Sequence, residues 1–232
     1  FAGPSYHTGE WPHEGVDFTG KRVGIIGTGS SGIQSIPVIA EQAKHLFVFQ
    51  RTPNYSVPAR HGTVTKESLD EVKKQYDNIM AKARASAVGM HYEQSGQSAL
   101  EVSEEERNAT YERGWEEGGA KFLFGSFNDI GSDIRANDTA SDFIRKKIRE
   151  IVKDPATADL LADIDHPYAA KRPPIDTQYF EAFNRDNVEI VDVRSDPIEA
   201  ITPSGIRLQS GAEYPADIIV FATGFDAELL DG

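Results

Sequence analysis

One tight pattern of glycines constrains the fold of this chain more than any other feature. Gly27–Gly32 has the pattern G-x-G-x-x-G and follows a short run rich in β-branched residues, Arg22–Ile26. Ser30–His45 then has the composition of a helix, and Leu46–Phe49 is a second apolar run. A strand, a tight turn, a helix and another strand form a βαβ unit, the building block of parallel sheets. The sequence therefore predicts an α/β fold with a mostly parallel sheet, in which Pro37 kinks the helix.

At this place in a βαβ unit, the glycine pattern is the fingerprint of a Rossmann-like, dinucleotide-binding fold. Gly27 permits the tight turn, Gly29 lets a pyrophosphate approach the backbone, and Gly32 lets the helix pack closely on the strand. Unpaired backbone amides at the start of the helix, near Ser30 and Ser31, point toward the anion. A plain glycine turn is the alternative, but the βαβ context favours nucleotide binding.

The residues after the second predicted strand indicate which nucleotide is bound. An NAD-binding domain usually has Asp or Glu about 20 residues after the glycines, whereas this chain has Gln50, Arg51 and Thr52 there. A carboxylate would repel a 2′-phosphate, but a guanidinium and a hydroxyl bind one, so the sequence favours NADP(H). The alternative for Arg51 is a solvated charge at a strand end. Lys171 is a second candidate for the phosphate if its segment returns close to the turn.

The residue pattern in the middle of the chain changes to one typical of helices, which predicts a helical insertion. Lys66–Ala85 has apolar residues at three- and four-residue steps, Ser103–Glu106 has the pattern of a capping box, and Asp154 followed by Pro155 begins a short helix. Strand-like runs return at Val188–Val191 and Asp217–Ala222. We therefore predict a linker over 1–20, a nucleotide-binding domain over 21–60 and 166–232, and an inserted helical subdomain over 61–165.

Composition excludes several classes of function. The formal net charge of −13 predicts that nucleic acid and anionic membrane surfaces are repelled, so any bound anion is held locally. With no cysteine and no cluster of histidines at ligand spacing, we expect no metal site, and the lack of cysteine suits the cytoplasm. The longest apolar run is too short to span a membrane. A start without methionine suggests a piece of a longer protein.

The first residues carry a motif with no generic physical meaning. It comprises Phe1, Gly3, His7, Trp11 and Pro12. On residue chemistry alone, a lone histidine here is more often part of ordinary packing than of catalysis. The spacing nevertheless resembles the F-x-G-x-x-x-H-x-x-x-W-P signature of Baeyer–Villiger monooxygenases, which precedes their second nucleotide fingerprint.

The resemblance extends over nearly the whole chain. Within the family, the sequence looks most similar to the phenylacetone and cyclohexanone monooxygenase group. The resemblance includes the helical insertion and the segments Gly27–Gln34, Phe47–Pro53, Lys171–Arg172, Asn184–Asn187 and Ala222–Asp226. It implies an enzyme that uses NADPH, FAD and O2 to convert a ketone into an ester or lactone. The FAD fingerprint and the substrate loop of such enzymes do not occur in this chain. We therefore expect the chain alone to bind NADP(H), with the FAD-binding half of the same protein as its partner, and not to oxidise ketones.

The resemblance also implies roles for individual residues. His7 of the signature is expected to couple movements of the FAD and NADPH domains. Arg51 and Thr52 are expected to hold the 2′-phosphate with help from Lys171, and Arg172 resembles an active-site arginine that approaches flavin and nicotinamide. For Lys171 and Arg172, charge pattern alone would favour an exposed basic pair. The cofactor-binding residues implied in full are Gly27, Thr28, Gly29, Ser30, Ser31, Gly32, Gln34, Arg51, Thr52, Lys171, Thr223 and Gly224.

Two other functions stay open at this stage. One is a related flavin monooxygenase that oxygenates nitrogen or sulfur, which shares the NADPH turn; the His7 and Trp11 signature and the helical insertion favour the ketone oxidisers. The other is a non-catalytic module that senses NADP(H) and signals through a partner.

Overall fold

A computed structural model describes residues 1–86, 89–92 and 95–225. Contacts divide the chain into two compact units, 1–56 with 144–232, and 57–143. The second boundary falls inside helix α6 (Ile134–Ile151), whereas the sequence placed the limits of the helical insertion at 61 and 165.

A five-stranded parallel sheet forms the centre of the first unit. Its strand order is β1-β10-β2-β3-β6, and every neighbouring pair is parallel. The predicted parallel sheet and βαβ unit are therefore confirmed. The predicted linker contributes a strand that the sequence did not indicate, β1. The bounds are β1 (Ser5–His7), β2 (Arg22–Ile26), β3 (His45–Gln50), β6 (Val188–Asp192) and β10 (Ile218–Phe221).

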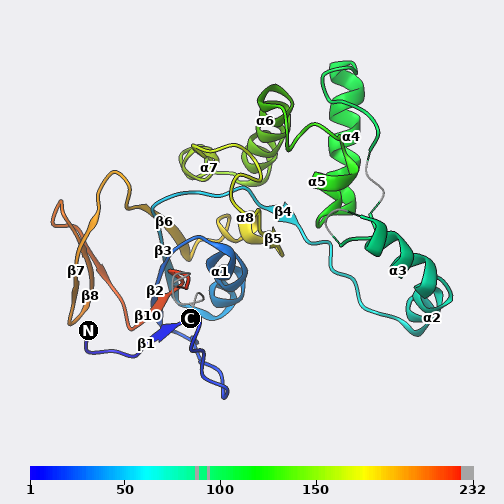
Figure 1. The fold of residues 1–232 in the computed structure, drawn as a ribbon. Helices are drawn as coiled ribbons and strands as arrows, with labels where there is room; N and C mark the ends of the chain where they lie inside the picture. The colour runs from blue at the N-terminus through cyan, green and yellow to red at the C-terminus, as the bar shows by residue number, and fades with distance from the viewer. Residues whose placement is uncertain (87–88, 93–94, 226–232) are drawn as a thin grey trace, which may run out of the picture. The chain divides into compact units, whose positions relative to one another are not determined.

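Helix α1 (Ser30–Gln42) covers one face of this sheet (Figure 1). Side chains alternate along a strand, and Val23, Ile25, Leu46 and Val48 are fully buried. The helix contributes Ile33, Ile36 and Ile39 to the same core, and Pro37 lies inside the helix without ending it.

An antiparallel sheet covers the opposite face, and sequence reasoning missed it. It consists of β7 (Ile198–Thr202), β8 (Gly205–Leu208) and β9 (Glu213–Pro215). The ring of Tyr214 packs edge-on against those of Phe47 and Phe49, at 5.3 and 5.4 Å between centroids. A Cβ on Gly24 would lie 2.9 Å from Ile206 Cδ1, so this glycine lets the two sheets approach.

The first unit also contains α7 (Pro155–Ala162), β5 (Ile175–Asp176) and α8 (Tyr179–Ala182). Hydrogen bonds with polar side chains stabilise the ends of its helices. Asp154 caps α7 as predicted, accepting a hydrogen bond from Thr157 N at 2.8 Å. The Asn187 amide donates to the carbonyl oxygens of Ala40 and Ala43, which satisfies the end of α1 and fixes it beside β6.

The second unit contains β4 (Val57–Pro58), α2 (Lys66–Lys74), α3 (Tyr76–Ala85), α4 (Glu104–Glu117), α5 (Lys121–Gly125) and the first part of α6. Its core is a cluster of aromatic rings. Stacked and edge-on contacts at 5.3–6.3 Å join Tyr111, Trp115, Phe122, Phe127 and Phe143.

Two local predictions for this unit need correction. The predicted helix Lys66–Ala85 is two helices that meet at Gln75, and neither buries a residue. The predicted capping box at Ser103 is only half formed. Ser103 accepts from Glu106 N at 3.2 Å, but the Glu106 carboxylate accepts from the Gln97 amide instead of turning back to the cap.

Two further features are absent from the residues that the structure describes. No helix among them has the length and apolar character to cross a membrane. They also contain no group of His, Asp or Glu side chains arranged to hold a metal ion.

Candidate functional site

An open cavity of about 780 Å³ lies where β2, β3 and β10 end. In an open parallel sheet this carboxyl edge is where ligands bind. All of its lining residues belong to the first unit. They are Ile26, Gly27, Thr28, Gly29, Ser30, Ser31, Phe49, Arg51, Thr52, Arg172, Val193, Pro197, Ile198, Ala222, Thr223, Gly224 and Phe225.

The three fingerprint glycines have different physical reasons. Gly27 has a φ of +107°, and a Cβ there would lie 2.4 Å from the Ala222 carbonyl oxygen. A Cβ on Gly32 would lie 2.2 Å from the Gly27 carbonyl oxygen. Packing of the protein itself therefore excludes side chains at Gly27 and Gly32. A Cβ on Gly29 would meet no protein atom within 4 Å. Packing of the protein therefore does not require glycine there, and the missing side chain leaves the space above the turn open.

The start of α1 faces this space with its backbone amides. Gly29 is the N-cap residue, no side chain caps the helix, and no acidic residue lies in its first turn. A helix start carries partial positive charge from its unpaired N–H groups and favours an anion. The arrangement therefore suits a phosphate group next to Gly29–Ser31.

A buried hydroxyl ties the glycine turn to the end of β3. Thr28 Oγ1 donates to the Thr52 carbonyl oxygen at 3.2 Å, and Thr28 is 5% exposed. The neighbouring Gln50 is also buried, and its amide donates to the Leu160 carbonyl oxygen at 3.0 Å. These two bonds fix the backbone on either side of Arg51.

Two guanidinium groups line the cavity, one from Arg51 and one from Arg172. Both side chains are exposed, and within the described residues neither has an ion-pair partner. Acidic residues outnumber basic ones, 37 to 24, so two uncompensated arginines at one cavity indicate an anionic ligand.

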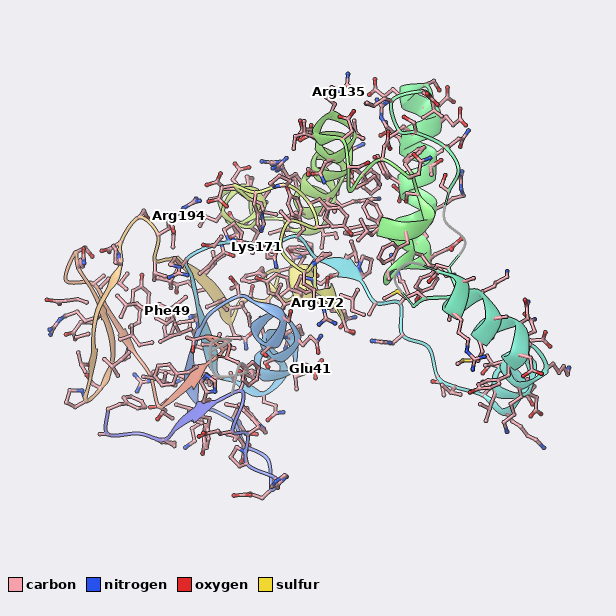
Figure 2. The ribbon with its side chains drawn as sticks, in the orientation of Figure 1. Glu41, Phe49, Arg135, Lys171, Arg172 and Arg194 are labelled. Carbon is pink, nitrogen blue, oxygen red and sulfur yellow. The ribbon has the colours of Figure 1, made fainter. Side chains whose placement is uncertain are left out.

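Lys171, which precedes Arg172, is not among the cavity residues; Figure 2 labels both side chains. Burial lowers the pKa of nearby His166, and the positive charge of Lys171 lowers it further. His166 stacks on Tyr55, with ring centroids 5.5 Å apart.

An apolar wall completes the cavity beside Arg51, and sequence reasoning missed it. It consists of Ile26, Phe49, Val193, Pro197 and Ile198, which come from β2, β3, the connection from β6 to β7 and the start of β7. A wall of this kind next to a guanidinium suits a planar base, which gains from apolar contact and from stacking on the cation. The wall carried no sequence signal, because each residue is an ordinary apolar residue and they are far apart in the chain.

The signature residues at the start of the chain lie around β1 rather than in the cavity. A Cβ on Gly3 would lie 2.5 Å from the Asp217 carbonyl oxygen, so this glycine lets the chain approach β10. Phe1 packs against the apolar cluster that includes Phe49, and the Trp11 ring lies 6.2 Å from that of Phe18. The Pro12 carbonyl accepts from Gly15 N in a turn. His7 contacts Thr223, a cavity residue.

The structure thus brings together most of the residues that the sequence singled out. Nine predicted cofactor contacts line the cavity with Arg172, the predicted catalytic residue. Gly32 lies beneath the turn, and Gln34 and Lys171 are not among the lining residues. The roles of all these residues stay predictions. The nine contacts are Gly27, Thr28, Gly29, Ser30, Ser31, Arg51, Thr52, Thr223 and Gly224.

Comparisons with known proteins find similar monooxygenases. No family model matches the chain. Curated relatives include a Baeyer–Villiger monooxygenase of Pseudooceanicola batsensis, 49% identical, and cyclohexanone 1,2-monooxygenase of an Acinetobacter species, 45% identical; each match covers 98% of this chain and 41% of the relative. A solved structure of an oxidised steroid monooxygenase bound to NADP matches with a TM-score of 0.95 at 53% identity, over 100% of this chain and 44% of that one. The chain therefore spans less than half the length of these relatives.

One relative has a different activity in its name. Phenazine N-monooxygenase of Lysobacter antibioticus is 45% identical over 97% of this chain, which covers 41% of the relative. Sequence similarity alone therefore does not separate oxygenation of carbon from oxygenation of nitrogen.

Proposed function

We propose that this chain, which is homologous over almost its entire length to one segment of the Baeyer–Villiger monooxygenases, is the NADP(H)-binding part of such an enzyme. The complete protein would use NADPH, FAD and O2 to convert a ketone into an ester or lactone. Its FAD-binding half is the partner of this chain. The observation that carries the proposal is the cavity, which joins a glycine turn, a helix start and two arginines at the carboxyl edge of the sheet.

The cavity residues fit each part of NADP(H). The pyrophosphate would lie over Gly29 against the first amides of α1, where the protein leaves open space. The 2′-phosphate would bind Arg51 and Thr52, and the adenine would pack on the apolar wall beside Arg51. The nicotinamide half would then extend toward the end of β10. The lack of an acidic residue after β3 removes the group that would repel the extra phosphate.

Arg172 is the residue of this chain that we assign to the chemical step. FAD, bound mainly by segments outside this chain, supplies the redox chemistry and the oxygen activation that no protein side chain provides. The Arg172 guanidinium would stabilise negative charge as it develops on the reacting oxygen atoms. Preorganised charge of this kind contributes about 3–4 kcal/mol to lowering a barrier. Its assignment rests on its place in the cavity wall and on the family resemblance.

The test joins this chain to its FAD-binding half and follows NADPH consumption with a panel of cyclic, linear and aromatic ketones. We expect NADPH consumption that depends on ketone and O2, with an ester or lactone as product. Arg172→Ala should abolish product while leaving NADP+ binding measurable. Normal ester formation by this variant would refute the catalytic assignment. Arg194→Ala is the matched control because it removes an exposed arginine that is not among the cavity residues.

A second candidate is oxygenation of nitrogen, which the similarity to phenazine N-monooxygenase favours. The same reconstituted protein distinguishes the two functions when phenazines and tertiary amines are added to the panel. An N-oxide as the dominant product, with no ester or lactone from any ketone, would replace the first proposal by the second.

A further inference from the structure

His7 makes contacts in three directions, all at the end of the sheet where β1 and β10 lie side by side. Its Nδ1 accepts a hydrogen bond from Gly9 N at 3.1 Å, and its Nε2 lies 3.4 Å from Thr223 Oγ1. Its ring meets that of Phe225 edge-on, with centroids 6.3 Å apart. The ladder aligns this cluster, because His7 pairs with Phe221 and Thr8 N donates to the Phe221 carbonyl oxygen at 3.0 Å. Two of the contacted residues, Thr223 and Phe225, line the cavity.

These contacts fix the direction of the hydrogen bonds. An imidazole nitrogen that accepts from a backbone N–H carries no proton, so the ring proton is on Nε2. Nε2–H then donates to Thr223 Oγ1. A hydroxyl that accepts one hydrogen bond still has its own proton to donate. His7 therefore leaves Thr223 as a hydrogen-bond donor at the cavity wall.

The order of the strands indicates which part of a dinucleotide meets Thr223. Strand β2, which carries the glycine turn, lies between β3 and β10. Arg51 and the apolar wall lie on the β3 side, where the adenosine half would bind. The other half must then extend over the end of β10, where Thr223, Gly224 and Phe225 lie. Oxygen atoms of the nicotinamide ribose and carboxamide are acceptors that match a donor hydroxyl.

We propose that His7 is a positioning residue for the nicotinamide half of NADP(H), because it holds the Thr223 hydroxyl as a donor toward the cavity and packs against Phe225. The inference rests on the proposed function. It assigns His7 an effect on nucleotide binding within this chain, which is separate from any coupling to a second domain. Neither His7 nor the contact between its side chain and Thr223 needs the FAD-binding half.

The test uses calorimetric titration of this chain with NADP+ and with adenosine 2′,5′-bisphosphate, which lacks the nicotinamide half. His7→Ala and Thr223→Val should each weaken NADP+ binding about three- to tenfold, as for the loss of one neutral hydrogen bond. Both should leave bisphosphate binding within about twofold of the wild-type value. The double variant should be no weaker than either single variant, because the two residues act as one unit.

Two conservative variants separate the two nitrogens of the ring. His7→Gln places an amide near the position of Nε2 and should restore NADP+ affinity. His7→Asn places one near Nδ1 and should not. His13→Ala is the matched control, an exposed histidine of the same segment, and should bind both ligands like wild type. Circular dichroism of each variant checks that it is folded.

Four outcomes would overturn the inference: equal loss of both ligands, additive losses in the double variant, rescue by Asn but not by Gln, or wild-type affinity for both ligands in the His7 and Thr223 variants. If the wild-type chain binds neither ligand, the proposed function itself fails. If the wild type binds both and the variants change nothing, only the role of His7 is wrong.

Discussion

At the scale of single residues, the glycine turn offers a paired test of the site. Gly29 has φ −79° and ψ −170°, a conformation open to alanine, and a Cβ there meets no protein atom. Gly29→Ala should therefore change thermal stability only slightly, and downward, because alanine is a poorer N-cap residue than glycine. It should still weaken NADP+ binding at least tenfold, because the methyl group occupies the space expected for the pyrophosphate.

Gly27→Ala is the matched variant, and its main effect should be a loss of stability. The positive φ and the close Ala222 carbonyl oxygen oppose a side chain, so the free energy of unfolding should fall by more than about 1 kcal/mol. Thermal melts and calorimetry measure both variants. A Gly29→Ala protein that binds NADP+ normally would mean that the ligand does not approach this turn.

Arg51 should determine the choice between the two nicotinamide dinucleotides. A charge-assisted hydrogen bond to a phosphate contributes about 1.5–3 kcal/mol, so Arg51→Ala should weaken NADPH binding about ten- to a hundredfold. NADH binding should change little, because NADH lacks the 2′-phosphate. Calorimetry with both ligands measures this difference, and Arg194→Ala provides an exposed arginine outside the cavity as control. Equal losses for both ligands would indicate a folding defect instead.

Residue patterns predicted the polar half of the site better than the apolar half. The glycines, Arg51 and Thr52 follow one short βαβ unit, so their spacing in the sequence fixes their spacing in space. The wall residues Phe49 and Ile198 meet only because the end of β3 and the start of β7 pack into the same apolar cluster. No local pattern encodes a contact between segments that are so distant in the chain.

At the scale of secondary-structure elements, an ion pair joins the first residue of β2 to the residue that precedes β10. The Arg22 guanidinium donates to both Asp217 carboxylate oxygens, at 2.7 and 3.1 Å, and Arg22 N donates at 2.8 Å. Both side chains are more than a third exposed, which weakens the charge interaction. Asp217→Asn should therefore lower the free energy of unfolding by only about 0.5–1 kcal/mol. Urea denaturation measures this change. A loss of several kcal/mol would show that solvent does not weaken this ion pair.

The helices of the second unit should differ sharply in their tolerance of substitution. Leu69 in α2 is 43% exposed, so Leu69→Ala should change the free energy of unfolding by less than about 0.5 kcal/mol. Phe122 is fully buried among aromatic rings, so Phe122→Ala should cost about 3–5 kcal/mol. Similar losses from both variants in urea denaturation would show that the face of α2 carrying Leu69 is covered in solution.

Element prediction succeeded for α1, which the composition after the glycine turn indicated, and for α7, which a cap signal indicated. It missed β1, β7, β8 and β9. Of these, β1 and β9 are only three residues long and carry too little periodicity to be predicted. The three- and four-residue spacing in Lys66–Ala85 correctly indicated helix. Periodicity could not locate the break at Gln75, and it could not tell whether an apolar stripe is buried or exposed.

At the scale of the whole molecule, stability should fall with acidity in two stages. The pKa of His166 is lowered from its ordinary 6.5, mainly by burial. The unfolded chain therefore binds a proton at this histidine more readily than the folded chain does. The contribution of neutral His166 to the free energy of unfolding is fully present above pH 6.5 and is lost as the pH falls below that value. The Arg22 guanidinium lowers the pKa of Asp217 from 3.8 to about 2, so its contribution is present above 3.8 and lost toward 2.

Urea denaturation across this pH range measures both stages. His166→Phe keeps a ring against Tyr55 and should reduce the first stage, while Asp217→Asn should reduce the second. An unchanged profile in His166→Phe would assign the first stage to another group.

The edges of the central sheet have a consequence for how the chain behaves while it folds. An exposed strand edge offers unpaired amide and carbonyl groups to other copies, which can start aggregation. At one edge β1 is only three residues long, and at the other β6 carries the charged residues Glu189 and Asp192. A short edge and a charged edge are both poor templates for pairing between molecules. Substitution of Glu189 by an apolar β-branched residue would remove part of this protection without touching the cavity.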